Sequence, residues 1–194
     1  GALPGAYYNV IGMAESDPNL EIVKNPSSTQ LYNAVKFSGR TKKKLGIGIF
    51  NAVTAPMKAV LRNKTTGEET SVETEPLANY NILVLDQAFK GRSSLTFTNT
   101  NVMRNGAARD ANVSAFDFAL YDRRNLFALQ GTARYSRIWS VNGYDGYNTT
   151  LKYGKVSGNW QYYLLGNVES KNYDPNDLGI LQAANEISYR GSLS

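Results

Sequence analysis

The side chains that could do chemistry in this sequence are carboxylates, amides and cations, because histidine and cysteine are both absent. The chain therefore lacks the commonest general base and has no thiol nucleophile or thiolate metal ligand. Glycoside hydrolysis needs two carboxylates at a fixed separation across a cleft, and the acid pairs here fall in predicted loops or on a predicted solvent-facing hairpin. We expect a non-enzymatic protein without a cofactor. The acid pairs are Glu68/Glu69, Glu73/Glu75 and Asp174/Asp177.

Two predicted loops contain polar clusters. In the run YDPND, Asp174, Asn176 and Asp177 could offer oxygen ligands to Ca²⁺. The run lacks the glycine-centred loop and terminal glutamate of an EF-hand, and Asp-Pro-Asn-Asp is itself a good turn sequence. A structural turn is therefore favoured, with a metal site as the weaker alternative. In the other loop, charged residues around Asn-Gly could pair within the loop, contact a neighbouring loop or hold a polar ligand. These charged residues are Arg104, Arg109 and Asp110.

The elements that would position these residues are nine segments in which apolar and polar residues alternate. Between residues 112 and 121, for example, Phe116, Phe118 and Leu120 alternate with Asp117. Because strand side chains point to opposite faces in turn, this period predicts a sheet with one apolar and one polar face. A further hairpin is predicted, with arms 57–63 and 68–74. The nine segments are 31–38, 45–53, 79–88, 93–102, 112–121, 126–138, 147–153, 159–168 and 185–191.

The links between these segments are predicted to alternate between short and long. Outer-membrane barrels have short periplasmic turns and long outer loops, whereas a soluble meander has no reason to gather its long links at one end. The short links hold much of the chain's basic charge, and a row of cations at one rim suits an anionic headgroup surface better than a DNA groove. Solvated turn residues explain those cations equally well. The short links are 39–44, 89–92, 122–125 and 154–158, and the long links are 54–78, 103–111, 139–146 and 169–184.

Alternation alone does not decide which face lies outside. Apolar residues fill the interior of a small soluble barrel, whereas they face lipid in a membrane barrel. The segments run close to the roughly 9–11 residues of a tilted membrane strand, and many of the 13 tyrosines lie near segment ends, as in an aromatic girdle. Both features favour a membrane barrel. The polar-face candidates are Asp117, Gln130, Arg134 and Lys152, and the girdle candidates are Tyr80, Tyr121, Tyr135, Tyr147 and Tyr153.

Five stretches together resemble a large family of uncharacterised outer-membrane proteins of Bacteroides-type bacteria. In that family a domain similar to family-nine carbohydrate-binding modules precedes a C-terminal β-barrel domain of unknown function, and some members are labelled membrane-associated hydrolases. The binding module is not part of this chain, so its glycan function does not transfer to these residues. The stretches are 35–54 (VKFSGRTKKKLGIGIFNAVT), 75–86 (EPLANYNILVLD), 97–117 (FTNTNVMRNGAARDANVSAFD), 151–156 (LKYGKV) and 173–179 (YDPNDLG).

The sequence thus predicts an all-β fold: an antiparallel up-and-down transmembrane β-barrel, here as a partial barrel or fragment. Residues 1–30 hold three of the six prolines and are predicted as an irregular lead-in or plug-like segment, and residues 31–194 as barrel strands. No signal peptide opens the chain, and an odd number of crossings is unusual for a bacterial barrel, so we expect a piece of a longer protein.

The expected role is non-enzymatic passage, or surface presentation or binding, at the bacterial outer membrane. Outer-membrane lipid is the expected partner, a glycan or another outer-membrane protein is a further candidate, and nucleic acid is not expected. The alternative is a soluble β-barrel or sandwich that binds a glycan or small ligand through an inward-facing aromatic surface.

Overall fold

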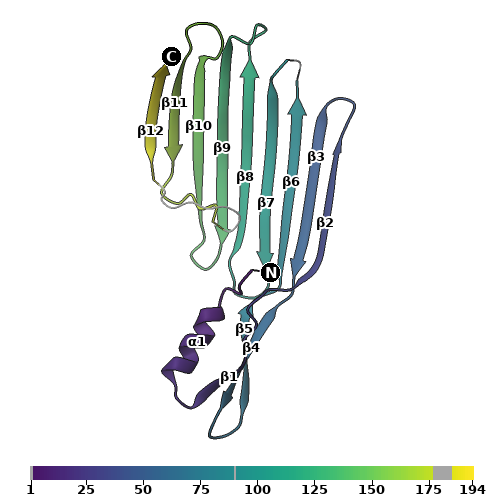
Figure 1. The fold of residues 1–194 in the computed structure, drawn as a ribbon, viewed down its shortest axis with the longest axis vertical. Helices are drawn as coiled ribbons and strands as arrows, with labels where there is room; N and C mark the ends of the chain where they lie inside the picture. Colours follow the sequence, from purple (N-terminus) through teal and green to yellow (C-terminus); the bar gives the residue numbers. More distant parts are fainter. Residues whose placement is uncertain (1, 90, 177–184) are drawn as a thin grey trace. The chain divides into compact units, whose positions relative to one another are not determined.

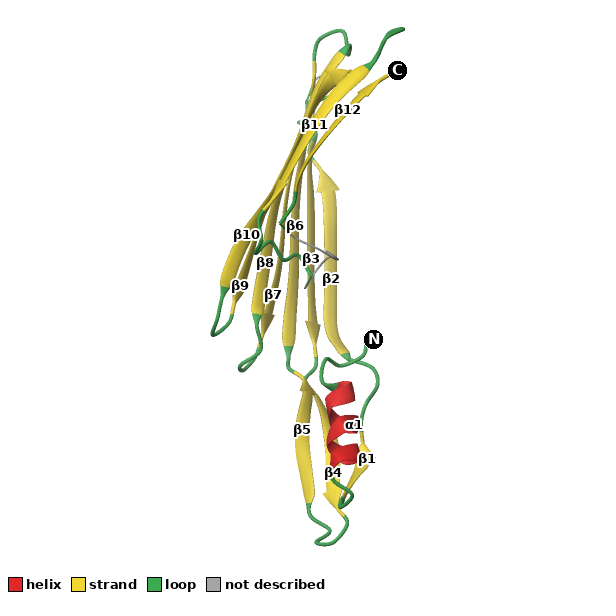
Figure 2. Ribbon diagram, turned by 90° about the vertical axis from the view of Figure 1, so that its left-hand side faces the viewer, coloured by secondary structure: helices red, strands yellow, loops and turns green. Residues whose placement is uncertain are grey.

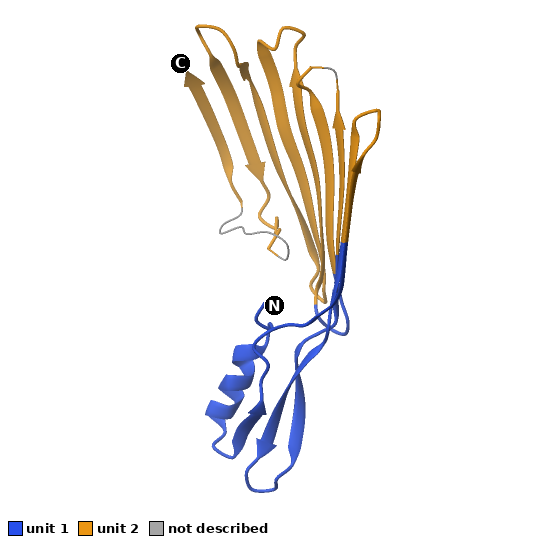
Figure 3. Ribbon diagram, turned by 45° about the vertical axis from the view of Figure 1, so that its right-hand side comes forward, with its two compact units in different colours: residues 1–35, 51–80, 103–108 blue, residues 36–50, 81–102, 109–194 orange. Residues whose placement is uncertain are grey.

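Two sheets and one helix make up the regular structure (Figure 1), which a computed structural model describes for residues 2–89, 91–176 and 185–194. Strands account for nearly all of it (Figure 2). The chain divides into two compact units (Figure 3): unit 1 comprises residues 1–35, 51–80 and 103–108, and unit 2 comprises residues 36–50, 81–102 and 109–194. No helix in these described stretches is both long enough and apolar enough to cross a bilayer.

Unit 1 contains the helix and the smaller sheet, whose strands lie in the order β1-β4-β5. Val10 of the helix packs with Ala59 and Leu61 of β4, and all three are at most 4% exposed. Ala59 and Leu61 are two residues apart, so they point from the same face of the strand toward the helix. The elements are α1 (Tyr7–Ser16), β1 (Leu20–Lys24), β4 (Met57–Asn63) and β5 (Glu69–Glu75).

Arg62 joins the three strands of this sheet on its other face. Its guanidinium donates to Glu21 on β1 at 3.1 Å and to Glu69 on β5 at 2.6 Å. The turn between β4 and β5 is closed by the Asn63 side chain, which accepts the N–H groups of Thr65 and Thr66. The predicted hairpin is confirmed, with arms within one residue of the predicted ones.

Residues 1–30 are more regular than the sequence led us to expect, because they contain α1 and β1. The helix has no side-chain cap and no acidic residue in its first turn, so the usual start signals are missing. Its stability comes from burying Val10 against β4, a contact that local sequence does not reveal.

The larger sheet has nine strands in the order β12-β11-β10-β9-β8-β7-β6-β3-β2. All nine predicted segments are strands, to within three residues at either end. An antiparallel all-β fold is thereby confirmed. Within the residues described, β2 and β12 each have one neighbour, so the sheet has two edges and no closed barrel is found. The strands are β2 (Leu31–Arg40), β3 (Leu45–Thr54), β6 (Ala78–Ala88), β7 (Ser94–Arg104), β8 (Asp110–Tyr121), β9 (Phe127–Trp139), β10 (Tyr144–Lys155), β11 (Tyr162–Glu169) and β12 (Ile187–Leu193).

The register of β7 to β12 assigns side chains to two faces. Residues directly opposite each other in a ladder share a face. Phe118, Gly131, Leu151 and Gly166 form one such row across four strands. We call the side of the sheet that carries this row the apolar face. Its larger side chains are Phe97, Phe116, Phe118, Leu120, Phe127, Leu129, Tyr135, Tyr147, Leu151, Tyr153, Leu164 and Tyr189. We call the other side the polar face: Thr96, Asp117, Gln130, Thr132, Arg134, Ser136, Asn148, Thr150, Lys152, Asn167 and Arg190.

The predicted alternation of link lengths holds only in part. The links 55–77 and 170–186 are long, but β7 and β8 are joined by residues 105–109 and β9 and β10 by residues 140–143 alone. The strands run past the predicted segments into residues such as Asp110 and Asp145, where backbone pairing continues. Two of the four predicted long loops are therefore short turns.

Gly154 on β10 tests this pairing, because a Cβ there would overlap the carbonyl oxygen of Tyr162 on β11. We expect Gly154→Ala to lower the free energy of unfolding by about 1–3 kcal/mol through this clash. Gly166→Ala is the matched control, since its Cβ would meet only the Tyr189 ring at 3.6 Å. Denaturant titration should show destabilisation in the first variant alone. Equal midpoints would mean that β10 and β11 do not approach as described.

Candidate functional site

The apolar face is the more exposed face of the sheet. Along β10, Tyr147, Leu151 and Tyr153 are 52%, 50% and 46% exposed. The intervening Asn148 is buried and Lys152 is half-buried. This order is the reverse of a water-soluble sheet, in which polar residues face solvent and apolar residues are covered.

The apolar face carries a continuous band with polar or aromatic limits. On β9 the band runs from Phe127 to Tyr135, a length comparable to the roughly 9–11 residues that cross a bilayer with tilt. Beyond Tyr135, the next residue on this face is Arg137, which donates to Asp145 of β10 at 2.9 Å. An ion pair marks the place where the band ends and water or headgroups can begin.

Three of the five girdle candidates lie on the apolar face. Tyr135 and Tyr147 are directly opposite each other at one limit of the band, and the Tyr153 ring stacks on Phe127 near the other, with centroids 6.3 Å apart. Tyr121 is on the polar face, opposite Ala128, where the Arg92 guanidinium lies 4.8 Å from its ring. Tyr121 is therefore not part of the aromatic residues that limit the apolar band. Tyr80 is a half-buried residue of unit 1.

The four polar-face candidates do share one face of β8, β9 and β10. Gln130 is directly opposite Lys152, and the Asp117 carboxylate lies 3.8 Å from the Arg134 guanidinium. The Lys152 ammonium lies 4.3 Å from the Tyr163 ring. Paired and stacked charges of this kind can line a hydrated surface without the cost of an isolated buried charge.

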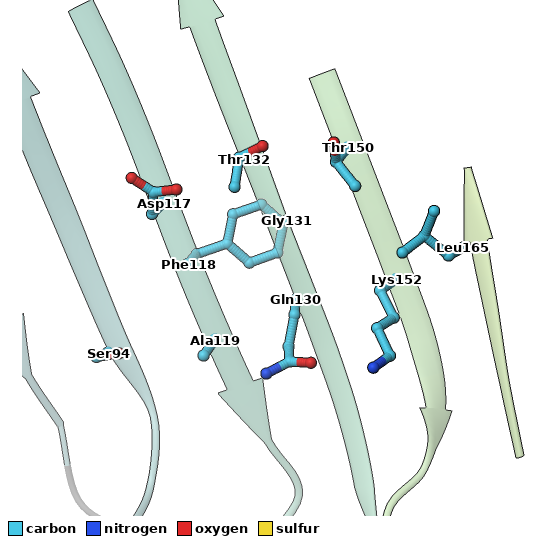
Figure 4. A pocket seen from close by; sticks show the side chains of 10 residues that line it. All are labelled: Ser94, Asp117, Phe118, Ala119, Gln130, Gly131, Thr132, Thr150, Lys152 and Leu165. Atoms are coloured by element: carbon cyan, nitrogen blue, oxygen red, sulfur yellow. The ribbon is translucent and has the colours of Figure 1, made fainter. Parts of the chain in front are cut away.

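An open pocket of about 300 Å³ lies among these side chains, and Figure 4 shows Gln130, Thr132 and Lys152 around it. The Thr132 hydroxyl oxygen is buried and has no hydrogen-bond partner among the residues described. A buried hydroxyl of this kind is normally satisfied by water or by a polar solute. The lining combines hydrogen-bonding side chains such as Gln130, Thr132 and Lys152 with apolar ones such as Phe118, Ala119 and Leu165.

At the other end of the polar face, one stretch of loop lies directly on the sheet. We call residues 170–176 the covering segment. Ser170 exchanges hydrogen bonds with the backbone of Tyr147, and the Asp174 N–H donates to the Ser136 hydroxyl at 3.0 Å. Ser136 is fully buried and Tyr173 is 7% exposed. The segment thus packs on β9 and β10.

The Asp174 carboxylate is the centre of this attachment. One oxygen accepts the Tyr144 hydroxyl at 2.7 Å and lies 3.3 Å from the Arg109 guanidinium, and the other accepts the Asn176 N–H at 2.9 Å. Burial raises the pKa of Asp174, but these donors and the Arg109 charge outweigh it and hold the pKa below its ordinary value. The pKa of Tyr144 is raised by its hydrogen bond to Asp174 and by burial.

These contacts show what the polar residues of the two predicted loops bind. Arg109 contacts a neighbouring loop, and Asp174 serves a structural turn whose oxygens are already engaged by protein donors. Asp177 lies outside the described residues. No group of three or more acidic side chains that could hold a metal occurs in the described part of the chain. Of the other acids, Glu69 binds Arg62, and Glu75 accepts the N–H of Gly5 at 2.6 Å.

Sequence reasoning did not find Tyr144 or Ser136 as partners of Asp174. They lie 30 and 38 residues away along the chain. In the sequence, Ser136 is one of several polar residues in the alternating segment 126–138. Tyr144 lies in the predicted loop 139–146. Gly146 also lies in the predicted loop, although the structure places it on β10, where a Cβ would overlap the backbone of Asn172 and Tyr173. A glycine inside a strand often marks a close backbone approach of this kind.

The lowered pKa of Asp174 makes the covering segment sensitive to acid. A carboxyl whose pKa is lower in the folded state stabilises the fold above its unfolded pKa of about 3.9, and this contribution is lost as the pH falls through the folded value. We expect hydrogen exchange of the Asp174 amide, corrected for its intrinsic rate, to accelerate on acidification below about pH 4. Asp174→Asn should remove this step; a step that persists in this variant would contradict its assignment to Asp174.

The comparisons with known proteins identify the family and nothing more specific. No curated protein matches the chain, and no solved structure matches it. The chain matches, over residues 1–194, a family described as a domain of unknown function, DUF5916. The chain therefore belongs to the DUF5916 family.

Proposed function

We propose that this chain is part of a non-enzymatic outer-membrane β-barrel, serving passage of polar solutes or surface presentation. Its apolar face contacts lipid, and its polar face lines a hydrated interior. The observation that supports this most is the reversed exposure of the two faces on β10, where Leu151 is 50% exposed and Asn148 is 6% exposed.

The extent of the apolar face makes a water-exposed sheet costly. Exposed apolar residues recur on consecutive strands: Phe116 on β8, Tyr153 on β10, Leu164 on β11 and Tyr189 on β12 are between 42% and 81% exposed. Leaving apolar surface in water costs about 25 cal/mol per Å², and soluble monomers rarely expose patches beyond about 300–600 Å². A surface spread over so many strands is better explained by a hydrocarbon environment.

The two edges of the sheet also support a partial barrel. β2 and β12 present unpaired backbone groups, and such groups cannot face hydrocarbon without a partner. In a lipid bilayer the edges need further strands, and the barrel closes when the last strand pairs with the first. We propose that additional strands of the same protein complete it.

The charge distribution supports one orientation. The turns that follow β2, β6, β8 and β10 lie at one end of the sheet (Figure 1). In these turns the only acid among the described residues is Asp122, whose carboxylate accepts the N–H groups of Leu126 and Phe127. Short basic turns suit the periplasmic side, next to anionic headgroups. The exposed cations of the turns are Lys42, Lys43, Lys44, Arg92, Arg123 and Arg124.

Neighbouring positions on β10 test the sidedness. We would attach a nitroxide through Leu151→Cys or Thr150→Cys, using the absence of native cysteine in this chain. In reconstituted membranes we expect the probe at 151 to be relaxed mainly by oxygen, which concentrates in lipid, and the probe at 150 mainly by a water-soluble nickel chelate. The physical reason is that adjacent strand residues face opposite sides.

The alternative, a soluble barrel or sandwich with an inward aromatic face, gives a different result. The probe at 151 would then be shielded from both relaxants, and the protein would stay monomeric without detergent. That outcome would overturn the membrane proposal. Equal relaxation at 150 and 151 would contradict both.

A further inference from the structure

We infer that the covering segment, residues 170–176, narrows the space along the polar face and sets the size limit for solutes that pass there. This inference rests on the proposed function, because it gives the polar face a hydrated interior. It adds a specific element, and specific anchoring residues, that determine which solutes fit.

The first step of the argument is that the segment lies over the polar face itself. Its anchors Ser136 on β9 and Tyr144 on β10 point from the same face of the sheet as Asp117 and Lys152. A loop that folded outward from the sheet end would leave Ser136 accessible. Instead Ser136 is fully buried, and its hydroxyl oxygen accepts the Asp174 N–H at 3.0 Å.

The second step is that the sheet is shaped to receive the segment. Gly146 faces it, and any side chain there would overlap the backbone of Asn172 and Tyr173. Glycine at this position allows the loop backbone to approach the strand closely. The Tyr173 side chain, 7% exposed, occupies space over the sheet that water would otherwise fill.

The third step is that the segment is held by charge as well as by packing. Asp174 is linked to Tyr144 and Arg109, and the Arg109 guanidinium also donates to the Tyr144 hydroxyl at 3.2 Å. The side chain of Asp174 is 16% exposed, so this ion pair is screened less than a surface pair. The segment is therefore a fixed element and not a freely moving loop.

The consequence concerns the chemistry of the solute. The polar side chains on the same face of β8, β9 and β10 include two cations, a carboxylate and an amide: Arg134, Lys152, Asp117 and Asn148. They offer hydrogen bonds of both kinds, and no single sign of charge dominates. Such a surface favours small polar, hydroxyl-rich molecules over large or strongly charged ones.

The test combines solute permeability with a direct report of the segment's position. The complete protein would be reconstituted into vesicles of phosphatidylethanolamine and phosphatidylglycerol, and swelling rates measured with neutral sugars of increasing size. Asp174→Ala and the milder Tyr144→Phe remove the anchor. We expect both to raise the swelling rate several-fold for sugars near the size limit, and to leave the rate for the smallest sugar nearly unchanged.

Glu69→Ala is the matched control, because it breaks an ion pair with Arg62 inside the three-stranded sheet of unit 1 and removes no contact of the covering segment. It should leave the size limit unchanged. The second readout is the thiol introduced by Ser136→Cys, which should be protected from a water-soluble thiol reagent and become reactive when Asp174→Ala is added.

The two readouts separate the possible failures. If the thiol becomes reactive but the size limit does not move, the segment does not restrict passage and the inference is overturned. If the thiol stays protected in both anchor variants, Asp174 does not hold the segment and the inference is again overturned. If no variant permits swelling by any sugar, passage itself is excluded whatever the thiol shows; this overturns the inference and the passage role in the proposed function, and leaves surface presentation.

Discussion

The structure depends on one constraint: every strand of the large sheet must send alternate side chains to opposite faces, and those faces differ in chemistry. The register keeps the alternation in phase from β7 to β12, so that Phe118, Leu151 and Gly166 fall in one row and Asp117, Thr150 and Asn167 in another. A slip of one residue in any pair would mix the two faces. Sidedness is thus a property of the whole sheet and not of single residues.

Two glycines on the apolar face are covered by aromatic rings from neighbouring strands. At Gly131 an added Cβ would lie 2.6 Å from the Phe118 ring, so the ring covers the glycine of the neighbouring strand. Tyr189 lies similarly over Gly166, at 3.6 Å from its Cβ position. Covering a glycine with an aromatic ring restores the side-chain packing that the glycine lacks. The apolar face therefore stays continuous even where the strands themselves carry no side chain.

Strand positions and faces could be predicted from sequence because both follow from local period-two alternation. The ends of strands could not. Asp110 and Asp145 continue the ladder beyond the predicted segments, where backbone hydrogen bonds persist although hydrophobic alternation has stopped. The contacts of Asp174 were equally out of reach, since Tyr144 and Arg109 lie 30 and 65 residues away. Spacing identified Asp174 as a turn residue, but only the folded sheet shows what the turn holds.

The same alternation that separates the apolar face from the polar face also determines where the covering segment packs. Ser136 and Gly146 are directly opposite each other on the polar face, and both are small. The Ser136 hydroxyl provides a hydrogen-bond acceptor, and Gly146 leaves room for the backbone of the covering segment. Larger residues at this row, such as the Arg134 and Asn148 pair next to it, would hold the segment away from the strands. A choice of residue size in one row of a strand pair thus fixes where a distant loop lies, and through that loop how much of the polar face stays open.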